Sequence, residues 1–246
     1  MKRFAFMLGN TDGLAGVKKD LHRFKSFLES DIGGAWERDD EIFCHCDLTY
    51  DEVMPIIETI RNESYDYVVF YFSGHGGMKR STELCLNANG DILSECELSG
   101  LANKQLSIYD CCRVFPKMVK TATNFALDES VESYLSRRRL YRKRFDALIA
   151  DASEQDVRLY ACHPDRYAND TSDGGVYTKH LLDVAEIQSL TGDVFVKKAH
   201  TLATNAVVID PDAFSNGVIQ YPDITINTKD CPPKDLVLAL GRSAYI

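Results

Sequence analysis

The sequence contains no charge-free apolar run that approaches the roughly 18 residues of a membrane span. Its opening stretch, MKRFAFMLGN, is too short to hold the apolar region and the cleavage site of a signal peptide. The turn at 9–13 lacks the full dinucleotide-binding fingerprint and the lysine of a phosphate-binding loop. These absences argue against a membrane partner, secretion and the common nucleotide-binding folds, and we expect a cytoplasmic protein.

Positive charge is scarce as well. The chain has 28 Lys and Arg against 37 Asp and Glu, which gives a net charge of -9 at pH 7. Nucleic-acid binders usually carry a basic excess, so we expect no nucleic-acid partner. The segment 137–144 is densely basic although the chain as a whole is acidic. Such charge runs commonly form the solvated face of a helix. The basic residues of this segment are Arg137, Arg138, Arg139, Arg142, Lys143 and Arg144.

The eight cysteines do not form the pattern of a disulfide framework. Many lie in predicted strands, two are adjacent, and no secretion signal precedes them, so we expect reduced thiols. Cys44-His45-Cys46, Cys111-Cys112 and Cys162-His163 lack the short spacer that usually separates zinc ligands. No calcium-binding loop is recognisable either. We therefore expect no structural metal site and no cofactor, while activation by calcium stays open.

Strand-like and helix-like patterns alternate along the chain. This order implies parallel strands joined by crossovers, and hence a layered α/β fold around a mostly parallel sheet. Toward the carboxyl end the pattern mixes loops and short strands whose order it does not predict. The predicted strands are 4–8, 41–46, 67–72, 106–109 and 157–161. Four helices are expected: one that starts at Val17, one after a capping box of Thr49 and Glu52, one over Asp128 to Ala152, and one after Gly175. A hairpin is expected over 84–93.

Three of the predicted strands end in reactive side chains. His75 follows the strand at 67–72, Cys111 and Cys112 follow the next one, and Cys162 follows the strand at 157–161. The carboxyl ends of parallel strands meet at one edge of the sheet, where open α/β proteins bind their ligands. We expect all of these groups at that edge.

A histidine and a cysteine at one edge suit nucleophilic catalysis. The cysteine attacks as a thiolate, which requires a base, and amide cleavage also requires donors for the oxyanion. His75 can serve as the base, while the amides of Gly76 and of the nucleophile can serve as donors. Alternation along the strand allows only one of Cys111 and Cys112 to face the cleft.

The paired motifs resemble those of the caspase-like cysteine peptidases, especially metacaspases and their bacterial relatives. FYFSGHG at 70–76 is similar to the histidine motif, and YDCCR at 109–113 to the cysteine motif. The segment from Leu159 to Thr178 resembles the start of the family's small subunit, and the likeness extends over about 1–188. The resemblance implies a caspase-like α/β/α sandwich, a catalytic dyad of His75 and Cys112, and an inert Cys111.

Charge suggests the specificity of such a peptidase. In the resembled family, the residue two positions before the nucleophile lies in the pocket for the side chain that precedes the cut bond, and here it is Asp110. An acidic pocket favours Arg or Lys and repels Asp. Asp165 is the second candidate for the pocket wall, and Asp170 is a weaker third.

The resemblance also suggests how the single domain 1–246 is organised. A part like the family's large subunit covers 1–127, a charged helical linker covers 128–155, and a part like the small subunit covers 156–246. Caspase-like chains often carry a processing site in the linker, so the basic run at 137–144 is a candidate autocleavage region or a docking face for an acidic regulator.

We therefore expect a cysteine endopeptidase that cuts protein or peptide substrates after Arg or Lys. The resemblance to bacterial effectors implies regulation by a sensor, a small signalling ligand or calcium, and a role in defence or cell death. Two alternatives stay open. Because Arg113-Val114-Phe115 replaces the His-Ser-Gly usual in metacaspases, the chain could be an inactive caspase-like scaffolding or binding domain; it could also be a cysteine hydrolase that acts on a small amide.

Overall fold

The computed structural model describes residues 1–114, 132–215 and 217–242. A six-stranded sheet forms the centre of this part of the chain, with the strand order β14-β8-β7-β3-β1-β2. Neighbouring strands are parallel except at the edge, where β14 runs antiparallel to β8. The strands of this sheet are β1 (Arg3–Gly9), β2 (Ile42–Cys46), β3 (Tyr67–Gly74), β7 (Lys104–Cys111), β8 (Gln155–Tyr160) and β14 (Asp223–Thr228).

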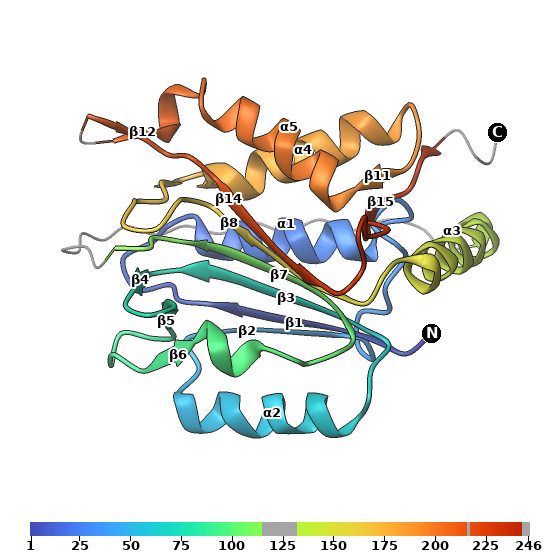
Figure 1. Ribbon diagram of the computed structural model, residues 1–246, viewed down its shortest axis with the longest axis horizontal. Helices are drawn as coiled ribbons and strands as arrows, with labels where there is room; N and C mark the ends of the chain where they lie inside the picture. Colours follow the sequence, from blue (N-terminus) through green and yellow to red (C-terminus); the bar gives the residue numbers. More distant parts are fainter. Residues whose placement is uncertain (115–131, 216, 243–246) are drawn as a thin grey trace.

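Helices cover both faces of the sheet (Figure 1). One layer contains α1 (Val17–Glu29), α3 (Glu132–Asp151), α4 (Val176–Ser189) and α5 (Val196–Val207), and the other contains α2 (Tyr50–Asn62). This arrangement confirms the predicted α/β/α sandwich. Smaller elements complete the described chain: β4 (Gly76–Met78), β5 (Thr82–Cys85), β6 (Ile92–Ser94), β9 (Asp170–Thr171), β10 (Gly174–Gly175), β11 (Val194–Phe195), β12 (Phe214–Ser215), β13 (Val218–Ile219), β15 (Val237–Ala239), and the 3₁₀ turns Glu95–Leu98 and Pro211–Ala213.

Strand β3 shows why its sequence is apolar at every position. Successive side chains of a strand point to opposite faces, so a strand at the centre of a covered sheet contributes to two cores. Tyr71 packs in the core beneath α1, where its ring stacks on Phe24 at 4.5 Å. Phe70 and Phe72 pack in the core beneath α2. Every residue of β3 is buried, as the unbroken apolar run predicts.

The predicted elements of the first half agree closely with the structure. The capping box before α2 is present, since Thr49 accepts from the amide of Glu52 and the Glu52 carboxylate accepts from the amide of Thr49. The hairpin expected over 84–93 is the antiparallel pair β5 and β6. The long charged helix is described from Glu132; its expected first residues, 128–131, lie outside the described part.

Helix α5 was not predicted. Its buried residues Val196, Ala199, Ala203 and Val207 recur at helical spacing, but small alanines carry a weak apolar signal, and polar residues separate them. None of the helices in the described ranges is long and apolar enough to cross a membrane.

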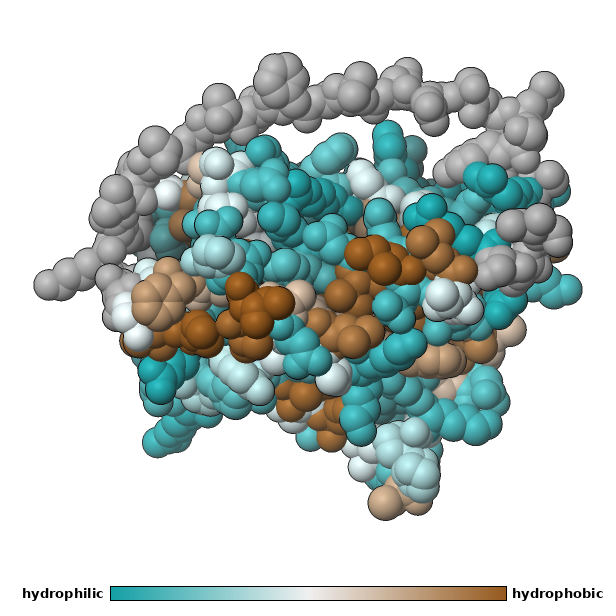
Figure 2. All heavy atoms as spheres, turned by 90° about the horizontal axis from the view of Figure 1, so that it is seen from above, coloured by the Kyte–Doolittle hydropathy of each residue, from teal (hydrophilic) through white to brown (hydrophobic). Residues whose placement is uncertain are grey.

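Large apolar side chains are exposed mainly on the layer that contains α4 and α5. Figure 2 views the molecule from above and shows apolar side chains gathered on the visible face among polar ones. Ile187 and Leu190 at the end of α4, Ile209 after α5, and Phe214 and Ile219 of the hairpin β12–β13 are 43% to 81% exposed. Exposed apolar area of the described chain is thus concentrated away from the α2 layer.

Helix α5 also buries a titratable group, which predicts how stability depends on pH. His200 is 5% exposed and lies 2.8 Å from the Tyr177 hydroxyl through Nδ1, and burial lowers its pKa to about 4. The unfolded chain binds this proton near pH 6.5, so stability is lost as pH falls from 6.5 toward 4. Replacing His200 with Asn removes this loss, and we expect the unfolding free energies of the two proteins to converge by about 2 kcal/mol between pH 7.5 and pH 5 in urea titrations.

The exposed His22 offers the matched control. The free energy of unfolding of His22→Asn should differ from that of the wild type by the same amount at pH 7.5 and at pH 5. A His200→Asn protein that loses as much stability in acid as the wild type would contradict the assignment.

Candidate active site

The register of β3 and β7 brings His75 and Cys112 together. Gly74 pairs with Cys111 in the parallel ladder, so the next residue of each strand, His75 and Cys112, leaves the sheet side by side. Ala161, which follows β8, donates its amide to the Tyr109 carbonyl at 2.9 Å and extends the same edge. In Figure 1 the arrowheads of β1, β3 and β7 point to the left, where this edge of the sheet lies. The three reactive strand ends therefore share one edge of the sheet.

Cys111 and Cys112 have different surroundings. Cys111 is 2% exposed and packs in the core beneath α2, where burial raises its pKa well above the usual value. Cys112 is only partly buried, and its Sγ donates to the Ala168 carbonyl at 3.4 Å. Burial also raises the pKa of Cys112, so its resting thiol is protonated at neutral pH. Attack by Cys112 therefore requires a nearby base.

His75 can be that base through one particular nitrogen. Its Nε2 lies 2.6 Å from the Asp12 carbonyl oxygen. A carbonyl can only accept, so Nε2 carries the hydrogen, and in the neutral ring Nδ1 then holds the lone pair. The backbone carbonyl thus selects the tautomer in which Nδ1 can take a proton.

Gly76 permits the close approach of the histidine and cysteine segments. A Cβ at this position would lie 2.7 Å from the Cys112 carbonyl oxygen and 2.7 Å from the Cys111 Sγ. Both contacts are closer than nonbonded atoms tolerate, and one of them involves backbone that cannot rotate away. Any other residue would push β4 away from the end of β7.

Asp110 lies behind the cysteines, at the start of α4. It is 5% exposed, and its Oδ2 accepts from the amide of Thr178 at 2.9 Å. A Cβ on Gly175 would lie 2.3 Å from this oxygen, so the glycine makes room for the carboxylate. Burial raises the pKa of Asp110 to about 6, despite the bonds from Thr178. The carboxyl therefore takes up a proton more readily than a solvent-exposed aspartate does.

A second buried carboxyl, Asp20, was not among the predicted site residues. It is fully buried and accepts from the amide of Gly175 at 2.9 Å and from the Ser73 hydroxyl at 2.9 Å. Burial, and then the charge of Asp110, raise the pKa of Asp20 well above the usual value. A signal was present, because Asp20 occupies a position on the buried stripe of α1 beside Leu21.

Asp170, the weakest of the predicted wall residues, joins this group. It pairs with Gly175 in the two-stranded β9–β10 sheet, and its Oδ2 accepts from the amide of Gly16 at 3.1 Å. Burial raises the pKa of Asp170, while the nearby His75 lowers it. The carboxyls of Asp20, Asp110 and Asp170 thus form one cluster near His75.

Asp165 lies apart from that cluster. It is exposed, it adopts a φ of 58°, and its amide donates to the Arg113 carbonyl at 3.1 Å. The Arg113 side chain turns toward the sheet edge, where its guanidinium lies 4.0 Å over the ring of Tyr160 and 3.3 Å from Asp223. Arg113, the residue after Cys112, is therefore packed into the fold.

The basic run lies in α3, and much of it is paired. The Arg137 side chain meets Asp31 at 2.7 Å, and that of Arg144 meets Asp193 at 2.6 Å. Arg138 donates to the carbonyls of Glu29 and Trp36, and Arg142 donates to the Glu41 carboxylate. The contacts of Arg137, Arg138 and Arg142 fasten α3 to the segment at 29–41, and that of Arg144 fastens it to Asp193. Autocleavage in this region stays a prediction.

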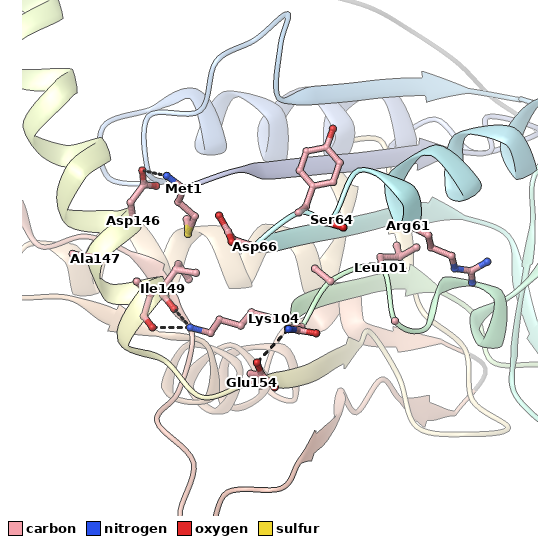
Figure 3. A pocket seen from close by; sticks show the side chains of 15 residues that line it. Met1, Arg61, Ser64, Asp66, Leu101, Lys104, Asp146, Ala147, Ile149 and Glu154 are labelled. Atoms are coloured by element: carbon pink, nitrogen blue, oxygen red, sulfur yellow. Dashed lines mark hydrogen bonds and ion pairs between the residues drawn. The ribbon is translucent and has the colours of Figure 1, made fainter.

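The cavity drawn in Figure 3 lies at the opposite ends of the strands. It has a volume of about 890 Å³, and neither His75 nor Cys112 lines it. Its polar groups are already engaged, since Lys104 donates to the carbonyls of Ile149 and Ala150 at 2.7 Å each. Within the described ranges, no group of three or more His, Cys, Asp or Glu residues is arranged to hold a metal ion.

Comparison with known proteins agrees with this geometry. No curated protein sequence matches the chain. The crystal structure of protein GSU0716 from Geobacter sulfurreducens has a similar fold, with a TM-score of 0.59 at 17% identity over 94% of this chain and 96% of that one. The sequence profile of the caspase domain matches residues 2–230. A match of that extent shows that the chain belongs to the caspase-domain family.

Proposed function

We propose that this protein is a cysteine endopeptidase that cuts after Arg or Lys through the dyad of His75 and Cys112. The observation that carries the proposal is the tautomer of His75, whose Nε2 hydrogen is held by the Asp12 carbonyl so that Nδ1 holds the lone pair, on a strand end next to that of Cys112. Family membership supports the coarser statement that the chain is a cysteine peptidase.

The reaction begins with proton transfer from the Cys112 thiol to His75 Nδ1. The sulfur attacks the substrate carbonyl, and the amides of Gly76 and Cys112 donate to the oxyanion. The tetrahedral intermediate collapses as His75 returns the proton to the leaving amine, which gives an acyl-enzyme. Water, deprotonated by His75, then releases the acyl group. No cofactor takes part in these steps.

The carboxyl cluster supports the basic specificity. A substrate guanidinium beside Asp110, Asp20 and Asp170 would favour the ionised state of carboxyls whose pKa burial has raised. Arg can pair with carboxylates through two parallel bonds, whereas an aspartate substrate would add another negative charge. We keep the exposed Asp165 as a candidate at the outer rim of the pocket.

Regulation is part of the proposal. The resting Cys112 donates to a backbone carbonyl, and burial raises its pKa, so the free protein holds a protonated nucleophile. We propose a cytoplasmic effector switched on by a sensor protein, a small signalling ligand or calcium, with a role in bacterial defence or cell death. The same protonated thiol is the observation that favours the rival function, an inactive binding domain.

Fluorogenic peptides that end in Arg, Lys, Asp or Leu test the proposal, each with and without calcium. We expect release after Arg and Lys, and none above background after Asp, because the pocket is acidic. Cleavage after Asp or Leu instead would contradict the specificity. If no peptide is cut, alkylation with and without calcium separates the two functions: a Cys112 that activation deprotonates becomes labelled faster than the exposed Cys96 and Cys231, whereas an inert Cys112 stays slower under both conditions.

A further inference from the structure

We propose that Asn10 is a positioning residue that holds the Asp12 carbonyl against His75 and thereby sets the tautomer of the catalytic base. The inference rests on the proposed function, in which His75 Nδ1 receives the proton of Cys112. Asn10 follows β1. It binds Asp12 and Cys85, and these two residues bind His75.

The evidence is a closed ring of four hydrogen bonds that starts and ends at His75. The His75 Nε2 donates to the Asp12 carbonyl at 2.6 Å, and the Asp12 amide donates to the Asn10 Oδ1 at 2.9 Å. The Asn10 Nδ2 donates to the Cys85 carbonyl at 2.8 Å, and the Cys85 amide donates to the His75 carbonyl at 3.0 Å. The ring therefore fixes both the backbone and the imidazole of His75.

Asn10 is held rigidly at the centre of this ring. It is 1% exposed, and its amide donates to the Ser73 carbonyl at 3.0 Å, which ties the end of β1 to the end of β3. A Cβ on Gly74 would lie 2.9 Å from the Asn10 Cβ, so the backbone before His75 runs directly against this side chain. A residue so enclosed has little freedom to change its hydrogen bonds.

The ring requires the chemistry of asparagine. One end of the side chain must accept from an amide two residues later, and the other end must donate to a carbonyl. Aspartate can accept at both ends but cannot donate when ionised, and it would place an oxygen against the Cys85 carbonyl. Serine is too short to span both partners.

The consequence for catalysis lies in the orientation of the backbone at Asp12. The bond from the Asp12 amide to Asn10 fixes the peptide group that precedes the Asp12 Cα, and this anchor restrains the following peptide group, whose carbonyl receives the Nε2 hydrogen. If the carbonyl turns away, the imidazole can carry its hydrogen on Nδ1, and that nitrogen then cannot take the thiol proton. Substrate contacts would be unaffected, so the loss should appear in kcat.

The experiment compares Asn10→Asp with Asn87→Asp in the full chain. Asn87 is the matched control: it is 6% exposed, its Nδ2 donates to the Leu48 carbonyl at 2.9 Å, and its Oδ1 accepts from the Asn89 amide at 2.9 Å, but none of these partners contacts His75. Asn10→Ser is the second variant, in case the aspartate prevents folding. Nitrogen NMR of the His75 ring reads the tautomer directly, and kinetics on the Arg peptide read kcat and KM.

We expect the wild type to carry the neutral-ring hydrogen on Nε2 and both Asn10 variants to shift toward Nδ1. The kcat of the variants should fall roughly 10- to 100-fold with KM changed less than about threefold, while Asn87→Asp keeps the wild-type tautomer and kcat. A wild-type ring with its hydrogen on Nδ1, or a folded Asn10 variant with an unchanged tautomer, would overturn the proposal. The NMR result holds even if no peptide is cut, so failure of the peptidase function is separately visible.

Discussion

Replacing Cys112 with alanine is expected to lower the hydrolysis of Arg and Lys peptides by at least about 10⁴-fold, because no acyl-enzyme can form without the nucleophile. Cys112 is only partly buried and follows the strand end that adjoins His75. The measurement is the initial rate of release from the Arg peptide, with the folded state of the variant checked by circular dichroism.

Cys111→Ala is the control for this loss. Cys111 packs in the core beneath α2, so its replacement removes buried sulfur and should cost some stability while leaving most of the activity. A protein that keeps its activity without Cys112 and loses it without Cys111 would show that the nucleophile is the other cysteine.

Replacing Asp110 with Asn is expected to have two opposite effects. The kcat/KM for the Arg peptide should fall by about 100-fold or more, since the pocket loses a buried charge that would pair with the guanidinium. The free energy of unfolding at pH 7 should rise, by up to about 3 kcal/mol, because the pKa of Asp110 is raised from 3.8 to about 6 by burial. An asparagine oxygen can still accept from the amide of Thr178.

The sign of this effect follows from the direction of the shift. A carboxyl whose folded pKa lies above its unfolded pKa destabilises the fold at high pH, and this cost disappears as pH falls from 6 toward 4. The advantage of Asp110→Asn over the wild type, measured by urea unfolding, should therefore be full at pH 7 and small at pH 4. Both proteins contain His200, so its opposite acid effect cancels in the difference.

Asp165→Asn provides the comparison, because the carboxyl of Asp165 is exposed and its removal should leave stability unchanged at both pH values. If Asp110→Asn were less stable than the wild type at pH 7, the buried carboxylate would be a net stabilising group, and the electrostatic account of the pocket would be wrong.

The sequence could predict that His75 and Cys112 lie at neighbouring strand ends because two strong rules coincide there. The unbroken apolar run of β3 predicts a central strand, and parallel strands bring their carboxyl ends to one edge. His75 and Cys112 then follow from the residues after those ends. The partner of His75 did not follow, since a backbone carbonyl such as that of Asp12 has no sequence signal.

Other features depend on contacts between distant segments, which a local pattern does not contain. The position of Asp20 on the apolar stripe of α1 indicates a buried carboxyl, but its partner Gly175 becomes visible only when α1 is placed against the start of α4. Strand β14 alternates partly buried isoleucines with polar residues, but its antiparallel pairing with β8 depends on the path of the chain between them. The carboxyl end was therefore the least predictable part of the fold.

The arginine contacts of α3 have a kinetic consequence. A peptidase binds its substrate in extended form, whereas Arg138 and Arg142 sit within a helix and are fastened to the segment at 29–41. Any cut in this region must wait for that stretch to open, and the rate of processing would then follow the local opening equilibrium. A partner that competes for Glu41 or displaces the helix would speed the cut without touching the catalytic dyad.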